Sequence, residues 1–161
     1  MLIAGCDPHT KKRVQVRAKG PGGLTGDWLA AGFIDLQVNG FAGVDFNDPR
    51  VTSQDYRRAV QTLWSTGVTR FCPTIITGSR DGLCRCLAAA ARAAEDKSAG
   101  PSIAGIHLEG PYISPEDGPR GAHPRQFVRP PDREEFRILQ EAAGGRIRMV
   151  KIGRASCRER V

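Results

Sequence analysis

One stretch of the sequence decides the fold, Gly105-Ile-His-Leu-Glu-Gly-Pro-Tyr112. Ile106 and Leu108 give it the apolar, β-forming character of a buried strand, and the Gly-Pro pair ends that strand abruptly. Glu109 therefore lies at a strand's carboxyl end, where parallel α/β folds collect binding and catalytic groups. A carboxylate at this place is either a solvated or ion-paired residue, which is the commoner case, or a metal ligand or general base.

Strands and helices alternate on both sides of this stretch. We expect strands over residues 32–40, 68–77, 103–109 and 146–150, and helices between residues 52 and 67, over residues 80–95 and between residues 132 and 144. This alternation with short connections is typical of βαβ units in a parallel sheet. A complete (β/α)8 barrel needs about 250 residues. We therefore predict an α/β fold, the N-terminal half of a (β/α)8 TIM-like barrel over residues 32–150.

The first of these helices carries the clearest local pattern. Thr52, followed three residues later by Asp55, matches a capping box, and Gly67 is a typical residue after a helix C-terminus. One face is apolar at helical spacing, so we expect it to pack in the core and not to form a cofactor site. Its residues are Tyr56, Ala59, Val60, Leu63 and Trp64.

Three polar residues alternate along the predicted strand over residues 32–40. Asp35, Gln37 and Asn39 share one face of this strand, which we otherwise expect to be short and buried. Buried polar groups need partners. A hydrogen-bond network inside the fold and a ligand or metal site are two ways to supply them, and both alternatives stay open.

The longest loop, residues 111–130, follows Glu109. A loop of this length beyond a strand's carboxyl end is more often functional than idle. His123 in this loop is either a surface residue or a hydrogen-bond partner of a ligand. His107 shares a strand face with Glu109, and we favour an interior histidine with satisfied hydrogen bonds over a ligand-binding one.

The composition is that of a globular protein with one ordinary domain. Of the 161 residues, 40% are apolar and 25% are charged. No apolar run approaches the ~18 residues needed to span a bilayer. The five cysteines lack a disulfide-framework spacing, and the N-terminal apolar run is too short for a signal peptide, so we expect a cytoplasmic protein without a membrane partner.

Both ends of the chain differ from its middle. Residues 1–31, with one alternating strand over residues 13–17, are expected to be a remnant of a small β-rich domain or linker. Residues 151–161 show neither helical nor strand periodicity. They can be encoded by a nucleotide string that resembles a widely used sequencing-library adapter, so we expect them to be non-native. Genomic DNA that encodes this tail without that string would refute the hypothesis.

The net charge of +7 raises the question of a nucleic-acid partner. The expected non-native tail, with Lys151 and three arginines against Glu159, accounts for +3 of this charge and leaves +4 for residues 1–150. The basic residues are scattered, and their one tight cluster, residues 11–13, lacks the interleaved aromatic side chains of a stacking platform. We therefore expect no nucleic-acid partner.

Four motifs in this order identify a family. They are Gly-Phe-Ile-Asp-Leu-Gln-Val-Asn-Gly at 32–40, Gly-Val-Thr-Arg-Phe-Cys-Pro-Thr at 67–74, the octapeptide at 105–112, and Arg-Gly-Ala-His-Pro at 120–124. Together, over about residues 31–150, they resemble the N-acetylglucosamine-6-phosphate deacetylases of the amidohydrolase superfamily. Ala31 stands where that family usually has Pro. The resemblance implies a barrel of the metal-dependent hydrolase type that converts N-acetylglucosamine 6-phosphate to glucosamine 6-phosphate and acetate.

The resemblance also implies roles for individual residues. Glu109 corresponds to a ligand of one divalent metal ion, zinc or iron, and Ala122 (through its backbone) and His123 to contacts of the amino-sugar phosphate. Gln37 and Asn39 stand where related amidohydrolases have His-x-His. Amides are poor zinc ligands compared with imidazole, so we expect a single-metal site. Gln37, Asn39 and His107 would lie next to the metal or beside its ligands.

The family's remaining catalytic groups come from later strands. Two histidine ligands and a catalytic Asp would follow residue 150, so we expect the chain to be a fragment that is inactive alone. In the family, the metal activates a water molecule and a carboxylate transfers protons. The resemblance further implies a homodimer for the full-length enzyme.

Other functions remain open at this point. The chain could belong to another mononuclear amidohydrolase, which the substrate profile of the full-length gene product would reveal. It could also be a non-catalytic half-barrel that binds a partner. A basic module with residues 11–17 on phosphates would need a steeply salt-dependent affinity for nucleic acid. The DNA that follows codon 150 would separate these possibilities best, because it either encodes the later ligands or does not.

Overall fold

The structure, a computed structural model, describes residues 2–6, 13–17 and 31–153. The chain divides into two compact units, Met1–Gly32 and Phe33–Val161. In the first unit, strands β1 (Leu2–Cys6) and β2 (Arg13–Arg17) pair antiparallel, which confirms the strand predicted over residues 13–17. Most of the predicted non-native tail, residues 154–161, lies outside the described residues.

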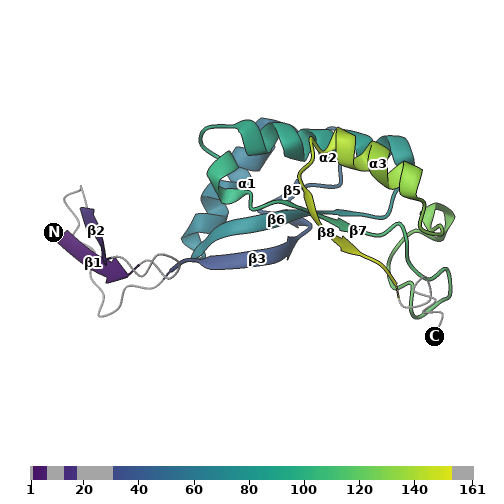
Figure 1. Cartoon of the computed structure of the whole chain (residues 1–161), viewed down its shortest axis with the longest axis horizontal. Coiled ribbons are helices and arrows are strands. Elements are labelled where there is room, and N and C mark those ends of the chain that lie inside the picture. Colours follow the sequence, from purple (N-terminus) through teal and green to yellow (C-terminus); the bar gives the residue numbers. More distant parts are fainter. Residues whose placement is uncertain (1, 7–12, 18–30, 154–161) are drawn as a thin grey trace. The chain divides into compact units, whose positions relative to one another are not determined.

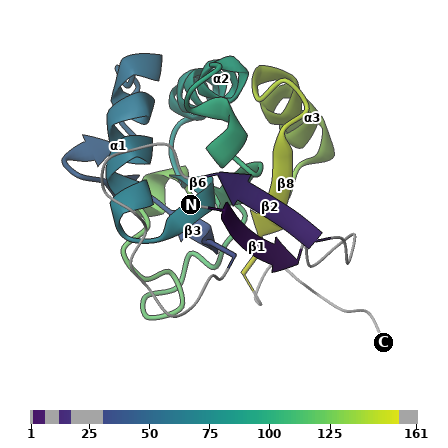
Figure 2. The same ribbon diagram turned by 90° about the vertical axis from the view of Figure 1, so that its left-hand side faces the viewer.

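The second unit is built on a four-stranded parallel sheet in the order β3-β6-β7-β8. The strands are β3 (Phe33–Val38), β6 (Val68–Ile76), β7 (Ile106–Glu109) and β8 (Ile147–Lys151). The helices α1 (Ser53–Ser65), α2 (Arg80–Glu95) and α3 (Arg133–Ala142) connect successive strands and cover one face of the sheet (Figures 1 and 2). The predicted α/β fold with a parallel sheet is confirmed.

Helix starts follow the predicted capping chemistry. Thr52 Oγ1 accepts a hydrogen bond from the backbone N–H of Asp55 (3.3 Å), and the Asp55 carboxylate accepts one from the backbone N–H of Thr52 (2.9 Å). This is the expected capping box of α1. Asp132 likewise caps α3 by accepting a bond from Glu135 N (2.9 Å). Gly67, after α1, adopts a φ of +84°, which a glycine reaches without strain.

The core lies between the sheet and the helices. Phe46 stacks on Tyr56 of α1 with ring centroids 4.5 Å apart, and on Phe71 of β6 at 5.9 Å. Leu108 of β7 is fully buried, as the apolar pattern of the opening octapeptide predicts. Its neighbours in the core are other fully buried side chains of β6, α2 and α3: Ile75, Leu83, Leu87 and Leu139.

Two expectations about burial are wrong. The strand predicted to be buried, β3, leaves Phe33, Ile34 and Leu36 more than half exposed, and only Val38 of the strand is buried. The reason is that β3 is an edge strand of the sheet, and none of the described helices covers the stretch with these three residues. Trp64, predicted to belong to the core, is 48% exposed. It lies at the margin of the apolar stripe of α1, where its indole N–H can donate to Ser102 Oγ (2.9 Å).

Short elements lie in the connections between the main strands and helices, and one of them falls in the predicted loop over residues 111–130. A two-stranded hairpin of β4 (Gly40–Phe41) and β5 (Val44–Asp45) follows β3, and single 3-10 turns, η1 and η2, cover Gly100–Ser102 and Arg125–Phe127. The two strands of this hairpin lie so close together that a Cβ on Gly40 would lie only 2.3 Å from the carbonyl oxygen of Val44.

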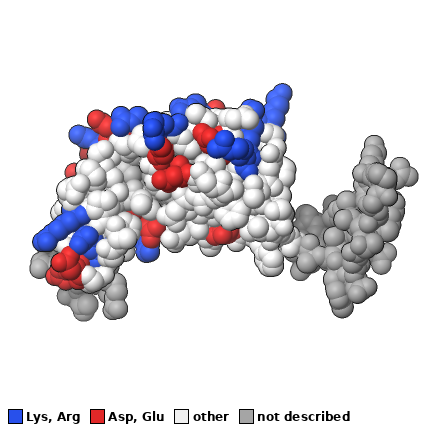
Figure 3. Space-filling view, turned by 180° about the vertical axis from the view of Figure 1, so that it is seen from behind, with Lys and Arg blue, Asp and Glu red and all other residues white. Residues whose placement is uncertain are grey.

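Charged side chains of both signs share the helical surface. On the face in Figure 3, basic residues lie beside acidic ones and form no continuous patch. Ion pairs between described residues include Arg57 with Asp96 (2.6 Å) and Arg146 with Glu95 (3.2 Å). Of the helices that the structure describes, none combines the length and the apolar character needed to cross a membrane.

Replacing Thr52 by Ala removes the hydroxyl that accepts the hydrogen bond from the backbone N–H of Asp55 in the capping box. We expect Thr52→Ala to lower the free energy of unfolding by about 1 kcal/mol, measured by urea denaturation. Thr62→Ala is the matched control, because the Thr62 hydroxyl only bonds back to the carbonyl of Arg58 on the exposed face of the same helix (3.0 Å). Equal losses in the two variants would contradict the role of the cap.

Candidate active site

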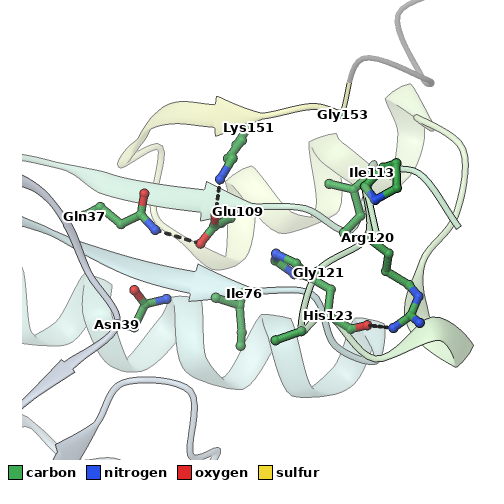
Figure 4. Close-up of a pocket in the computed structure, with 12 residues that line it drawn as sticks. Gln37, Asn39, Ile76, Glu109, Ile113, Arg120, Gly121, His123, Lys151 and Gly153 are labelled. Atoms are coloured by element: carbon green, nitrogen blue, oxygen red, sulfur yellow. Dashed lines mark hydrogen bonds and ion pairs between the residues drawn. The ribbon is translucent and has the colours of Figure 1, made fainter. Parts of the chain in front are cut away.

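A cleft of about 400 Å³ lies at the carboxyl ends of the parallel strands (Figure 4). It is lined from the end of β3, from β6 and β7, from the loop after β7, and from Lys151 of β8 and Gly153 beyond it. The cleft brings together five of the residues singled out from the sequence: Gln37, Asn39, Glu109, Ala122 and His123. Parallel strands make this convergence possible, because their carboxyl ends meet at one edge of the sheet.

Glu109 is the centre of this cleft. The residue is only 6% exposed, and its Oε2 accepts a hydrogen bond from Gln37 Nε2 (3.1 Å). Its Oε1 forms an ion pair with the ammonium of Lys151. Burial acts to raise the pKa of the Glu109 carboxyl, but the Lys151 ammonium, with smaller contributions from His123 and His107, lowers it below its usual value. The carboxylate is therefore held in its charged form and in a fixed orientation.

Gln37 and Asn39 line the cleft, but Asp35 does not. The Asp35 carboxylate instead accepts a hydrogen bond from the backbone N–H of Gln37 (3.0 Å). Two of the three alternating polar side chains thus reach the cleft, and the third bonds to its own strand.

His107 of β7 does not line the cleft. The side chain is buried, with Nδ1 3.2 Å from the carbonyl oxygen of Leu36 and 3.3 Å from Thr74 Oγ1. Burial lowers the pKa of the His107 imidazole, which favours the neutral ring. Its Nε2 is buried and has no hydrogen-bond partner among the described residues. The interior position expected from the sequence is found, but only one of the two ring nitrogens is satisfied.

The loop after β7 is held over the cleft by polar contacts. Arg120 Nη1 donates to the carbonyl oxygen of His123 (2.7 Å), and Arg120 also pairs with Asp117. His123 Nδ1 lies 2.9 Å from the hydroxyl of Thr77, which is the first residue after β6. These contacts fix His123 at its backbone and at one ring nitrogen.

Two residues of the site's frame are not evident from the sequence. The side-chain amide of Asn47 makes two hydrogen bonds to the backbone near the end of β6. Its Nδ2 donates to the Thr74 carbonyl (3.1 Å), and its Oδ1 accepts from the N–H of Ile76 (2.7 Å). Nothing in the polar loop around Asn47 marks it out. For Thr77, the one signal in the sequence is its place at the end of a predicted strand, which by itself is weak evidence for a site residue.

Comparison with known proteins places the chain in a family. The model of the amidohydrolase family matches residues 28–159. The chain belongs to the amidohydrolase family. Two relatives are N-acetylglucosamine-6-phosphate deacetylases: that of Bacillus subtilis is 36% identical over 127 residues, and that of Bos taurus 39% identical over 124 residues. These alignments cover 77% and 73% of the chain, which spans only 31% and 28% of the length of the two relatives.

Solved structures of amidohydrolases agree with this assignment. The N-acetyl-D-glucosamine-6-phosphate deacetylase of Mycobacterium smegmatis superposes with a TM-score of 0.65 and 32% identity, covering 84% of this chain and 38% of that one. A variant of the same enzyme, in complex with N-acetyl-D-glucosamine 6-phosphate, gives a TM-score of 0.69 at 28% identity, covering 87% and 38%. The half-barrel predicted from the sequence thus matches part of the barrel of these deacetylases.

The amidohydrolase family is metal-dependent, but the described residues do not make a complete metal site. Within residues 2–6, 13–17 and 31–153, no three His, Cys, Asp or Glu side chains come together in a group that could hold a metal ion. Catalytic zinc sites take three protein ligands. Glu109 is a suitable ligand by charge and position, but by itself it does not fit the requirement.

Gly110 keeps the loop start in a shape that only glycine allows. Its φ is +83°, and a Cβ at this position would lie 2.1 Å from Thr77 Oγ1. We expect Gly110→Ala to lower the free energy of unfolding by roughly 2–5 kcal/mol, adding overpacking to the cost of the left-handed backbone. Thermal and urea denaturation would measure the loss.

Gly118→Ala is the control for the left-handed backbone alone. Gly118 has a similar φ of +88°, but a Cβ added to it would meet nothing within 4 Å. This variant should lose only roughly 1–2 kcal/mol. If both variants lost the same amount, the contact between Gly110 and Thr77 would be unimportant for stability.

Proposed function

We propose that this chain forms the front part of an enzyme that removes the acetyl group from N-acetylglucosamine 6-phosphate, giving glucosamine 6-phosphate and acetate. One observation carries the proposal: the cleft joins a buried, charged Glu109 at a strand end to Ala122 and His123 of the following loop. These are the positions that the resemblance assigns to a metal ligand and to substrate contacts. The names of the relatives from Bacillus subtilis and Bos taurus support the same activity.

The chain's own residues have separable tasks in this proposal. Glu109 provides one anionic metal ligand, and Gln37 holds its second oxygen by a hydrogen bond of 3.1 Å. Ala122, through its backbone, and His123 bind the amino sugar, and Arg120 keeps their loop in place through the carbonyl of His123. Asn39 adds an amide group to the same cleft.

The metal ion, which we propose to be a single zinc or iron, needs further ligands from outside the described residues. Lys151 now places an ammonium group on Glu109, where the cation would bind. Under our proposal that residues 151–161 are non-native, this ion pair would not exist in the natural enzyme. The homodimer and the cytoplasmic location also stay predictions.

A chimera tests the proposed activity. Residues 31–150 of this chain would replace the matching segment of the Bacillus subtilis deacetylase, so that the relative supplies everything after residue 150, including its own residue in place of Lys151. We expect the purified, metal-loaded chimera to release acetate from N-acetylglucosamine 6-phosphate, and the 161-residue chain alone to release none. Acetate release by the chain alone would contradict the prediction that it lacks essential groups.

Within the chimera, Glu109→Gln tests the proposed ligand. Removing its charge should lower both the bound metal content and kcat/KM, the latter by at least about 100-fold. The reason is that the reaction depends on the metal ion and the ligand's charge helps to hold that ion. Glu134→Gln, on the exposed surface of α3, is the matched control and should leave both unchanged. A fully active Glu109→Gln chimera would refute the assignment.

A further inference from the structure

We infer that Asn47 is a positioning residue for the cleft: its side-chain carboxamide takes the place of a strand residue opposite Ile75, where β3 leaves β6, and so fixes the ends of both strands. That the cleft is an active site rests on the proposed function. The place of the carboxamide in the sheet does not, because it follows from contacts within the chain.

The ladder between β3 and β6 is irregular where it approaches the cleft. Asp35 pairs with Phe71 and Val38 with Pro73, so three steps along β3 match two steps along β6. This surplus of one residue is a β-bulge, a feature that re-aims side chains and is over-represented next to active sites. Gln37 lies within the bulge, and its side chain donates to the buried carboxylate at the end of β7 (3.1 Å).

Strand β6 continues for three residues beyond the last pair of this ladder. Thr74, Ile75 and Ile76 pair with β7 on one side, while β3 ends at Val38 and the chain turns into the hairpin of β4 and β5. In a parallel ladder, a residue bonds through its N–H and its C=O to the two residues that flank the one opposite it. A strand residue opposite Ile75 would therefore donate to the Thr74 carbonyl and accept from the N–H of Ile76.

The carboxamide of Asn47 makes this same pair of hydrogen bonds. Its Nδ2 donates to the Thr74 carbonyl (3.1 Å), and its Oδ1 accepts from the N–H of Ile76 (2.7 Å). Nδ2 has a second proton, which it donates to the carbonyl oxygen of Asn39, the residue that follows β3 (3.3 Å). One side chain thus continues the ladder on β6 and ties to it the segment that leaves β3.

The backbone of Asn47 is itself held in place. The preceding residue, Phe46, is fully buried and stacks on two aromatic rings of the core. The N–H of Phe46 donates to the Asn39 carbonyl (3.1 Å), and the N–H of Asn47 donates to the carboxylate of Asp45 (2.8 Å). The carboxamide therefore meets β6 in an orientation that its own backbone and the core determine.

The contacts of Asn47 bear on the shape of the cleft. Two of the residues that its carboxamide holds, Asn39 and Ile76, line the cleft, whereas Asn47 does not (Figure 4). Without the carboxamide, an N–H and a carbonyl at the end of β6 would lose their partner, which is costly at a largely buried strand end. We therefore expect the end of β6 and the segment with Gln37 and Asn39 to shift when this group is removed.

Hydrogen exchange of the 161-residue chain, followed by NMR, tests the place of the carboxamide. In the unmodified chain we expect slow exchange of the backbone amide of Ile76 and of the side-chain N–H protons of Asn47. Asn47→Ala should speed exchange at Ile76 by at least about 10-fold, because the N–H of Ile76 loses its acceptor.

Gln140→Ala is the matched control. The Gln140 carboxamide also bonds to strand backbone, accepting from the N–H of Ile147 (3.0 Å) and donating to its carbonyl (3.3 Å), but at the first residue of β8 and not at a carboxyl end. This variant should speed exchange at Ile147 and leave Ile76 unchanged. A general loosening of the sheet would instead change both amides in either variant.

The deacetylase chimera separates a positioning role from a purely structural one. We expect Asn47→Ala to lower the kcat/KM of the metal-loaded chimera by at least about 10-fold, because small displacements of groups around a reacting centre slow the reaction strongly. Gln140→Ala should leave kcat/KM unchanged, since the contact that it removes lies at the other end of its strand.

Unchanged exchange at Ile76 in a folded Asn47→Ala chain would overturn the inference, and so would fast exchange of the Asn47 side-chain protons in the unmodified chain. The second measurement still decides if the alanine variant does not fold. Equal kcat/KM values for the Asn47→Ala and Gln140→Ala chimeras would overturn the positioning role. The exchange spectra need neither metal nor substrate, so a negative result there leaves the deacetylase proposal standing, and an unmodified chimera without activity leaves the place of the carboxamide standing.

Discussion

The carboxylate of Glu109 is almost completely buried at the end of β7. Polar side chains of the cleft replace the hydrogen bonds with water that this group loses on burial. An unpaired buried charge is costly, so it must be neutralised or fully hydrogen-bonded. Among the described residues, Gln37 of β3 and Lys151 of the adjacent strand β8 supply that compensation. In the enzyme that we propose, the metal ion would take the place of the Lys151 ammonium as the compensating charge, and Gln37 would keep its hydrogen bond to the second oxygen.

The framework around this carboxylate was largely predictable from the sequence. Capping residues such as Thr52 and Asp132 act through contacts three residues away, so a short window of sequence contains the whole interaction. The octapeptide around Glu109 similarly contains its own apolar strand and its own strand breaker. Local patterns therefore located the helices, the strand ends and the loop with His123.

What could not be predicted depends on distant partners. The exposure of Phe33 follows from the position of β3 at the sheet edge, which no local pattern encodes. Asn47 bonds to backbone groups of β6 that are 27 and 29 residues away, and an asparagine in a polar loop looks the same with or without such partners. The contact of Thr77 with His123 spans 46 residues and is equally invisible in sequence.

The order of strands in the sheet has a consequence for how the cleft is assembled. Because β3, β6, β7 and β8 lie side by side in the order in which they occur in the chain, each strand pairs with the one synthesised just before it. Contacts between consecutive units close short loops and cost less chain entropy than contacts across the whole chain. On the ribosome, Gln37 precedes Glu109, so the buried carboxylate meets this hydrogen-bond donor as soon as its own strand docks, whereas β8 is added later.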